Sequence, residues 1–151
     1  MNISFCGHFH IYNESIISDY LKEEIEKVIV NGDESFYFNM FSDFDFIAYC
    51  IIDELKNTKY PNIKIIIVTD HVDNERLKYR NYDNYNVLLL ENDEVNRRRL
   101  KVMKNITDNS DYVICFVSNV LCVSYKIYNY IKKKNIKYTN LNKHFYHMFK
   151  E

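Results

Sequence analysis

Short, continuously apolar runs alternate along the chain with segments whose apolar residues recur at helical spacing. Short continuous runs are typical of strands buried on both faces of a parallel sheet. They predict strands at residues 2–6, 35–38, 63–68, 87–90, 112–117 and 136–141. The helical spacing predicts helices over residues 14–30, 44–55, 91–110 and 125–134. The alternation predicts an α/β fold with a mostly parallel sheet and helices on both faces.

Turns and helix ends in this chain depend on asparagine and serine. Gly occurs only twice and Pro once, and Asn is the residue that best tolerates left-handed backbone in place of Gly. We therefore expect Asn13 to cap the first helix and Asn135 to end the last, while Ser42 or Asp43 caps the second. Residues 70–86 are polar and aperiodic, which predicts a long loop.

Composition narrows the class of protein. The 151 residues suit a single domain spanning 1–151, and the net charge of −1 disfavours binding to nucleic acid or an anionic membrane. The basic runs at 97–99 and 132–134 are interpreted as solvated helix faces. Nothing resembles a signal peptide or a membrane span, so a cytoplasmic protein is expected.

Abundant Asn, Lys, Ile and Tyr suggest AT-rich codons and hence a bacterial or phage source. Four cysteines without C-x-x-C spacing are expected to be buried free thiols: Cys6, Cys50, Cys115 and Cys122.

Ligands of parallel α/β sheets bind beyond the carboxyl ends of the strands, at the switch in strand order. This rule selects the loops at residues 7–13, 39–43, 69–73 and 118–124. The candidate ligand-binding residues in and beside them are Gly7, His8, Asn39, Met40, Phe41, Ser42, Asp45, Ser118, Asn119, Ser124 and Tyr125.

Two of these candidates have equally simple structural roles. His8 could donate to a phosphate or ribose, or it could bond a neighbouring carbonyl. Asp45 could bind a ligand hydroxyl or amine, or it could stabilise the positive end of its helix. No nucleophile motif, Walker loop or dense metal-ligand spacing is present, so neither a cofactor nor a metal is expected. A catalytic pair formed by His8 and Asp45 stays open.

Several phrases, in order, resemble the stand-alone proteins of the SLOG superfamily, which is related to the DprA and LOG domains. "SFCGHFH" is similar to its F-x-G-H-R start, "FYFNMFSDFD" to its F-Y-x-G-G-x-G-x-F-D, and "DNSDYVICFV" to its D-N-S-D-Y-V strand. "VSYKIYNYIKKKNIKYTNL" resembles its G-G-A-Y-K helix and last strand. The resemblance covers nearly the whole chain. It implies a Rossmann-like three-layer sandwich that binds nucleotides or nucleotide-derived signals, often in conflicts between bacteria and phages.

This sequence differs from the pattern of the SLOG superfamily mainly at the glycines that bind the ligand in that family. Asn39 and Met40 replace the first glycine pair, Ser42 replaces the next glycine, and Cys122 with Val123 replaces the second pair. Phe9 stands where the family has an arginine, which removes a bidentate phosphate contact. The P-G-G-x-G-T-x-x-E motif of the LOG phosphoribohydrolases is missing.

Three functions follow in order of preference. The first is binding of a nucleotide or nucleotide-derived small molecule without catalysis, as a sensor or sequestering protein. The second is a degenerate scaffold that acts as a protein–protein interaction module. The third is hydrolysis of a nucleotide N-glycosidic bond, as some relatives in the family do. A homodimer is expected, partly from the resemblance.

Overall fold

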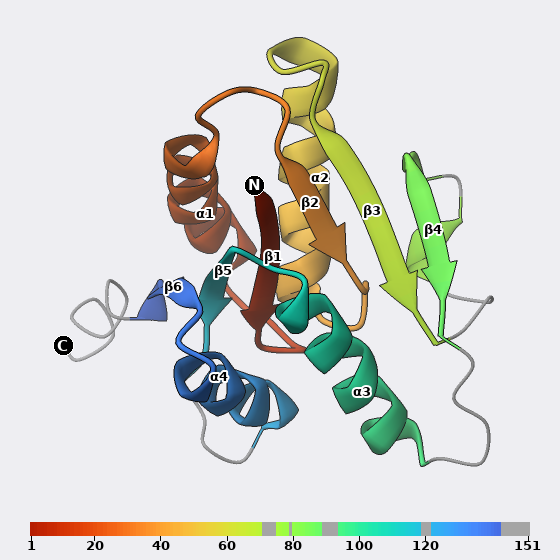
Figure 1. Ribbon diagram of the computed structural model, residues 1–151. Helices are drawn as coiled ribbons and strands as arrows, with labels where there is room; N and C mark the ends of the chain where they lie inside the picture. The colour runs from red at the N-terminus through yellow and green to blue at the C-terminus, as the bar shows by residue number, and fades with distance from the viewer. Residues whose placement is uncertain (71–74, 79, 89–93, 119–121, 143–151) are drawn as a thin grey trace, which may run out of the picture.

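A six-stranded, all-parallel sheet forms the centre of the computed structural model (Figure 1). The structure describes residues 1–70, 75–78, 80–88, 94–118 and 122–142. The strands lie in the order β4-β3-β2-β1-β5-β6. Their bounds are β1 Asn2–Gly7, β2 Ser35–Phe38, β3 Lys64–Thr69, β4 Asn84–Val87, β5 Tyr112–Phe116 and β6 Lys137–Asn140.

Four α-helices cover the two faces of this sheet. They are α1 Glu14–Val28, α2 Asp43–Thr58, α3 Val95–Asp108 and α4 Val123–Lys133, and a 3₁₀ helix, η1, spans Glu75–Leu77. In Figure 1, α2 passes behind β1 and β2, whereas α3 and α4 lie in front of the sheet. The predicted α/β fold, a Rossmann-like three-layer sandwich with helices on both faces, is confirmed, and every strand pair is parallel.

Alternation along β3 shows how the apolar runs fill both layers. Ile65 and Ile67 pack in the core beneath α1 and α2. Their neighbours Ile66 and Val68 point to the other face and pack against Val102 of α3. A strand that buries both faces in this way must be apolar at every position, and that is why it reads as a continuous run.

Polar residues set the helix ends largely as the sequence predicts. The Ser42 hydroxyl accepts the backbone N–H of Asp45 at 3.0 Å and caps α2. Asn135 follows α4 with φ of +57°, a left-handed conformation that Asn tolerates. Asn13 occupies the cap position of α1, but its side chain makes no capping hydrogen bond.

Two expectations about local structure are wrong. The fourth strand, expected at residues 87–90, runs over Asn84–Val87, so all but its last residue lie in the stretch expected to be loop, and η1 also falls there. Cys50 is exposed on α2 and Cys122 is half-buried, so only Cys6 and Cys115 are buried thiols as expected. The aromatic run HFYHMF at residues 144–149 lies outside the described residues.

The strand order places a topological switch between β1 and β5. The chain moves from β1 through β2 and β3 to β4, and then returns across the sheet to β5 on the other side of β1. Loops that leave the carboxyl ends of β1 and β5 therefore diverge toward opposite faces. Such a point is where open α/β sheets form their binding crevices.

Candidate functional site

Three of the loops selected from the sequence meet at the carboxyl edge of the sheet. The Nε2 atom of His8 lies 2.8 Å from the Ser118 hydroxyl, which joins the loops after β1 and β5. The His8 carbonyl accepts the backbone N–H of Phe44 at 3.4 Å, which joins the loops after β1 and β2. The Ser124 hydroxyl donates to the Gly7 carbonyl at 2.5 Å. The candidate residues that the structure describes thus come from one continuous edge.

The loop between β2 and α2 uses its own backbone donors internally. One carboxylate oxygen of Asp45 accepts the N–H of Asn39 at 2.9 Å and that of Met40 at 2.7 Å. The Asn39 side-chain oxygen accepts the N–H of Phe41 at 2.9 Å. The N–H of Asp43 donates to the Phe9 carbonyl. A phosphate at a helix N-terminus needs such donors, and in this loop the carboxylate of Asp45 takes the place of that anion.

Gly7 is required by packing rather than by a bound ligand. A Cβ atom at this position would lie 2.3 Å from the ring of Phe44, the second residue of α2. Non-bonded carbon atoms do not approach each other so closely, so the absence of a side chain at Gly7 lets α2 approach the end of β1. A nucleotide-binding glycine lets the backbone come close to a phosphate, whereas Gly7 lets it come close to an aromatic ring.

An arginine lies between two aromatic rings above these loops. The guanidinium carbon of Arg99, on α3, is 5.6 Å from the ring centre of Phe9 and 5.4 Å from that of Phe41. Both distances suit a cation–π interaction. Phe9 occupies the position where the resembled family has its arginine. The cation therefore comes from α3, where it joins the loops after β1 and β2.

Burial separates the predicted site residues into two groups. His8, Phe41 and Tyr125 are half-buried, and Ser118 is exposed, so these four have surface that a ligand can contact. Asn119 lies outside the described residues. The remaining candidates are buried and hydrogen-bonded or packed within the protein: Gly7, Asn39, Met40, Ser42, Asp45 and Ser124.

Burial also shifts the pKa values of two candidates. It lowers the pKa of the His8 imidazole. It raises the pKa of Asp45 to about 7, against the opposing effects of the N–H groups of Met40 and Asn39 and of nearby Arg76. His8 and Asp45 have separate partners: His8 bonds Ser118, and Asp45 bonds the loop that precedes it.

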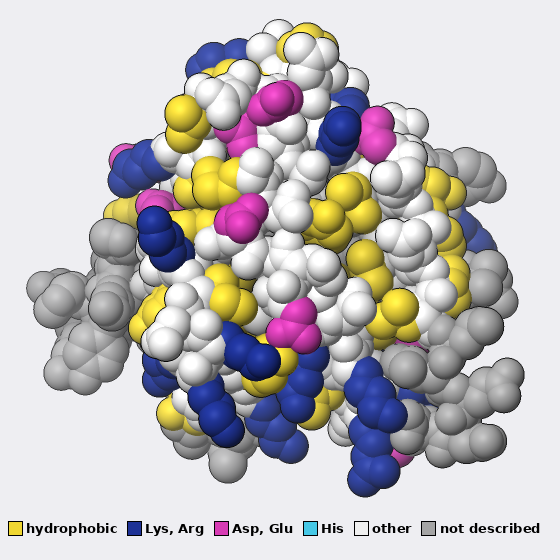
Figure 2. All heavy atoms as spheres, in the orientation of Figure 1, with side chains coloured by type: hydrophobic (Ala, Val, Ile, Leu, Met, Phe, Trp, Pro, Cys, Tyr) yellow, Lys and Arg dark blue, Asp and Glu magenta, His cyan; other side chains and the backbone are white. Residues whose placement is uncertain are grey.

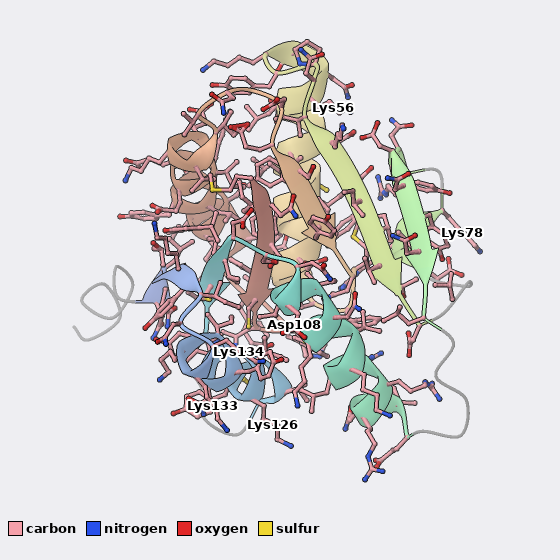
Figure 3. The ribbon with its side chains drawn as sticks, viewed as in Figure 1. Lys56, Lys78, Asp108, Lys126, Lys133 and Lys134 are labelled. Carbon is pink, nitrogen blue, oxygen red and sulfur yellow. The ribbon has the colours of Figure 1, made fainter. Side chains whose placement is uncertain are left out.

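A groove of about 420 Å³ lies between the first turns of α3 and α4, at the same end of the molecule. Arg97 of α3 and Lys126 of α4 stand on its two walls, with Leu100 and Val123 as its apolar lining. Figure 2 shows Lys and Arg side chains gathered on this side of the molecule, over α3 and α4. In Figure 3, Lys126 extends from α4 toward the lower edge of the view. Glu94 and Asn96 complete the lining.

Neither Arg97 nor Lys126 was predicted from the sequence to bind a ligand. Arg97 belongs to the basic run interpreted as a solvated helix face. Lys126 comes directly after Tyr125, the last of the candidate ligand-binding residues, and was not among them. Arg97 and Lys126 are more than twenty positions apart in the sequence. The hydrophobic pattern therefore does not indicate that α3 and α4 bring them to the same groove.

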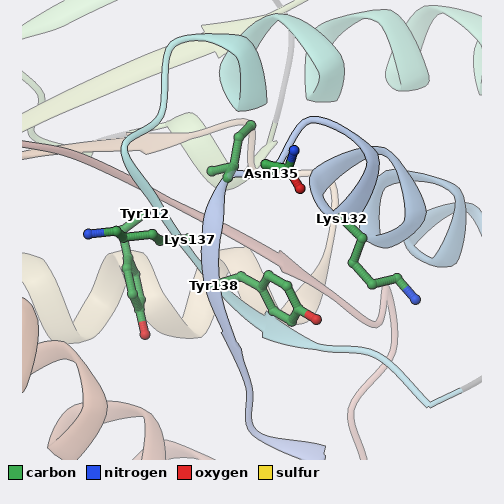
Figure 4. A pocket seen from close by; sticks show the side chains of 6 residues that line it. Tyr112, Lys132, Asn135, Lys137 and Tyr138 are labelled. Atoms are coloured by element: carbon green, nitrogen blue, oxygen red, sulfur yellow. The ribbon is translucent and has the colours of Figure 1, made fainter.

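Two further cavities lie outside this groove. One, of about 640 Å³, is formed by the end of α4 and the starts of β5 and β6, and Tyr112, Lys132 and Tyr138 line it (Figure 4). It therefore opens at the amino edge of the sheet, opposite the switch point. The other, of about 500 Å³, lies between α1 and α2 over Phe46 and Ile51.

No family model and no curated protein sequence matches the chain. Its class is therefore defined by its architecture, an α/β protein with a Rossmann-like, all-parallel sheet. None of the helices in the described part of the chain is long and apolar enough to cross a membrane. Within the same residues, no group of three or more His, Cys, Asp and Glu side chains is placed to hold a metal ion.

Proposed function

We propose that the protein binds a nucleotide or nucleotide-derived small molecule in the groove between α3 and α4, as a sensor or sequestering protein that does not catalyse a reaction on it. The observation that carries this proposal is the pair of cations, Arg97 and Lys126, that face one groove beside the switch point. Arginine can bind phosphate oxygens through two parallel hydrogen bonds, and lysine adds a point charge.

The size and lining of the groove suit such a ligand. Its volume of about 420 Å³ falls within the ~300–1,000 Å³ of typical small-molecule sites. Leu100 and Val123 offer apolar surface to a base, while Glu94 and Asn96 offer hydrogen bonds to ribose or base edges.

The helix termini favour an anion in this groove over the position that the resembled family uses. Two aspartates, Asp43 and Asp45, already occupy the first turn of α2. The first turn of α4 contains no acidic residue and the helix has no side-chain cap, whereas the acidic Glu94 stands at the N-cap of α3 and lines the groove. The positive end of α4 therefore adds to the field of Arg97 and Lys126.

Thermal unfolding against a panel of nucleoside mono-, di- and triphosphates tests the proposal. A ligand at 100 times its Kd adds ~2.7 kcal/mol, which raises Tm by ~5–10 °C in a protein of this size. We expect the double variant Arg97→Gln/Lys126→Gln to lose this shift. The variant Lys22→Gln/Lys78→Gln removes the same charge elsewhere and should keep it. A flat response of the unmodified protein, with no nucleotide released on denaturation, would refute nucleotide binding.

A protein–protein interaction scaffold is the second candidate function. It is favoured by the internal filling of the carboxyl edge, where Phe44 packs on Gly7 and Arg99 lies between Phe9 and Phe41. A flat nucleotide response together with a stable complex in which these residues stay packed would support this alternative.

A further inference from the structure

Charge is sorted between the two faces of the sheet. Helices α1 and α2 together carry nine acidic and three basic side chains, a formal charge of −6. Helices α3 and α4 carry eight basic and one acidic side chain, a formal charge of +7. These two charges nearly cancel, and the residues outside the four helices bring the net charge of the chain to −1. The net charge of the chain therefore does not reveal the acidic face or the basic face.

The basic side chains of α3 and α4 lie on neighbouring helices. Tyr130 of α4 donates its hydroxyl to Asp108 of α3 at 2.6 Å, and Lys104 lies over the Tyr130 ring at 5.3 Å, so the two helices are joined near their C-terminal ends, while the groove lies between their first turns. Figure 3 labels Lys126 and Lys133 on α4, Lys134 directly after this helix, and Asp108 at the end of α3. We call the surface that carries these side chains the cationic face, and its basic members are Arg97, Lys101, Lys104, Lys126, Lys133 and Lys134.

Most of these cations are exposed to solvent. Arg97, Lys101, Lys126, Lys133 and Lys134 are exposed, and Lys104 is half-buried. In contrast, the other two arginines of α3 are used inside the protein. Arg98 is paired with Asp70 at 3.1 Å, and Arg99 is stacked between two phenylalanines. The cationic face therefore consists of basic residues whose side chains reach solvent, and Lys132, which lies over Tyr128, is exposed beside it.

We propose that the cationic face binds the phosphodiester backbone of nucleic acid, independently of base sequence. Arg97 and Lys104 are seven residues apart, so the face extends over ~10 Å of α3 alone. A single mononucleotide in the groove would contact only its Arg97 and Lys126 end. The rest of the face offers further charges that a polymer with several phosphates can contact at the same time.

The observations favour nucleic acid over an anionic membrane. A helix surface that lies in a lipid interface inserts apolar side chains as well as presenting charge. Val95 is the one exposed large apolar residue that the described part of α3 and α4 provides. The other described residues of this kind lie on different elements: Met1, Tyr12, Ile16, Val30 and Tyr82.

The contacts predict binding without base readout. Lys104 and Lys134 both lie over the ring of Tyr130, at 5.3 and 5.5 Å, so this tyrosine is covered by ammonium groups rather than open for base stacking. Charge alone then supplies the affinity, and a Kd of ~10⁻⁴–10⁻⁶ M at physiological salt is expected. Neutralising about four to six phosphates predicts a slope of about −4 to −5 in log K against log salt concentration.

Fluorescence anisotropy with a labelled mixed-sequence DNA duplex of roughly 24 base pairs tests this inference across a salt series. The variant Lys101→Gln/Lys133→Gln/Lys134→Gln leaves the groove residues intact. We expect it to bind the duplex at least about tenfold more weakly, while its response to mononucleotides is unchanged. The matched control Lys22→Gln/Lys27→Gln/Lys78→Gln has the same net charge and should bind the duplex almost as the unmodified protein does.

Several outcomes would overturn the inference. One is no binding by the unmodified protein at low salt. Another is equal weakening in both triple variants, because that would report net charge and not a surface. Binding to phosphatidylserine vesicles but not to the duplex would assign the face to membranes.

A single strand of the same length tells whether duplex geometry matters, and thermal unfolding of each variant checks that it is folded. Since the cationic-face variant spares Arg97 and Lys126, duplex binding and nucleotide binding can fail separately.

Discussion

The Nε2 atom of His8 accepts the backbone N–H of Ser118 at 3.0 Å. This nitrogen must therefore be unprotonated in the folded protein, and the loops after β1 and β5 are joined through a neutral imidazole. Burial lowers the pKa of His8 and acts in the same direction. Protonation would replace an accepted hydrogen bond with two opposed N–H groups.

This arrangement predicts a loss of stability in mild acid. The unfolded chain, with an ordinary His pKa of 6.5, takes up a proton before the folded protein does. The free energy of unfolding should therefore fall as the pH drops below about 6.5, until the folded pKa is passed. Urea unfolding of His8→Gln, compared with the unmodified protein between about pH 7.5 and pH 5, should show less of this fall. The exposed neighbour variant His10→Gln serves as control, and an identical slope in His8→Gln would contradict the prediction.

Asp45 predicts the opposite pH dependence. Its pKa rises from 3.8 to about 7 on folding, so the folded protein holds the proton more tightly between these values. The contribution of Asp45 to stability is therefore largest below about pH 4 and falls as the pH rises to about 7. Asp45→Asn keeps an oxygen for the N–H groups of Asn39 and Met40 but cannot ionise. Relative to the unmodified protein, it should gain on the order of 2–4 kcal/mol between pH 4 and pH 8.

Chemical unfolding at both pH values measures this gain. Asp45→Ala is the matched comparison, because it removes the acceptor as well as the charge. We expect it to be destabilised at every pH by about 1–3 kcal/mol for each unpaired N–H. If Asp45→Asn followed the unmodified protein at all pH values, the carboxyl would have an ordinary pKa.

The contact between Gly7 and Phe44 predicts strong coupling between the two positions. Gly7→Ala should cost about 3 kcal/mol or more, because the new methyl group overlaps the ring. Phe44→Ala alone should cost about 3–5 kcal/mol through the cavity that it leaves. In the double variant the methyl group enters that cavity, so the total should be less than the sum by on the order of 1–3 kcal/mol. Additive costs in a double-mutant cycle would show that the two residues do not meet.

Asn135 predicts a small and discriminating effect at the end of α4. At its φ of +57°, a Cβ atom is strained in most residues. Asn135→Ala should lower the free energy of unfolding by about 1 kcal/mol. Asn135→Gly should change it by less than about 0.5 kcal/mol, because glycine adopts this conformation freely but gains entropy when unfolded. Thermal and urea unfolding of the two variants separate these values, and equal costs would argue against a left-handed residue.

Regular elements were predictable where both faces of a strand or one face of a helix are buried. The strand expected at 112–117 runs over Tyr112–Phe116, since burial on two faces leaves an uninterrupted apolar signature. The edge strand β4 was misplaced, because Asn84 and Asn86 face solvent and break that signature. The meeting of the loops after β1, β2 and β5 also followed from the sequence, since parallel strands bring their carboxyl ends to one edge.

The chemistry at that edge was not predictable, because it depends on side chains that meet across the fold. Asp45 was recognised as a carboxylate in a first helical turn, but its bonds back to Asn39 and Met40 need the bend at Met40, with φ of +65°. The resemblance indicated lost glycines, but not that Phe44 would occupy the space beside Gly7. Arg99 was expected among solvated basic residues, whereas it lies between two rings.

The opposed charges of the two helical layers give this nearly neutral protein a large electric dipole moment, directed through the sheet. Its electrostatic attraction to a charged surface then depends on which helical layer faces that surface, and not on the sign of its total charge. Near its isoelectric point of about 6.5 it should be retained by both cation-exchange and anion-exchange resins, each holding a different side of the same molecule.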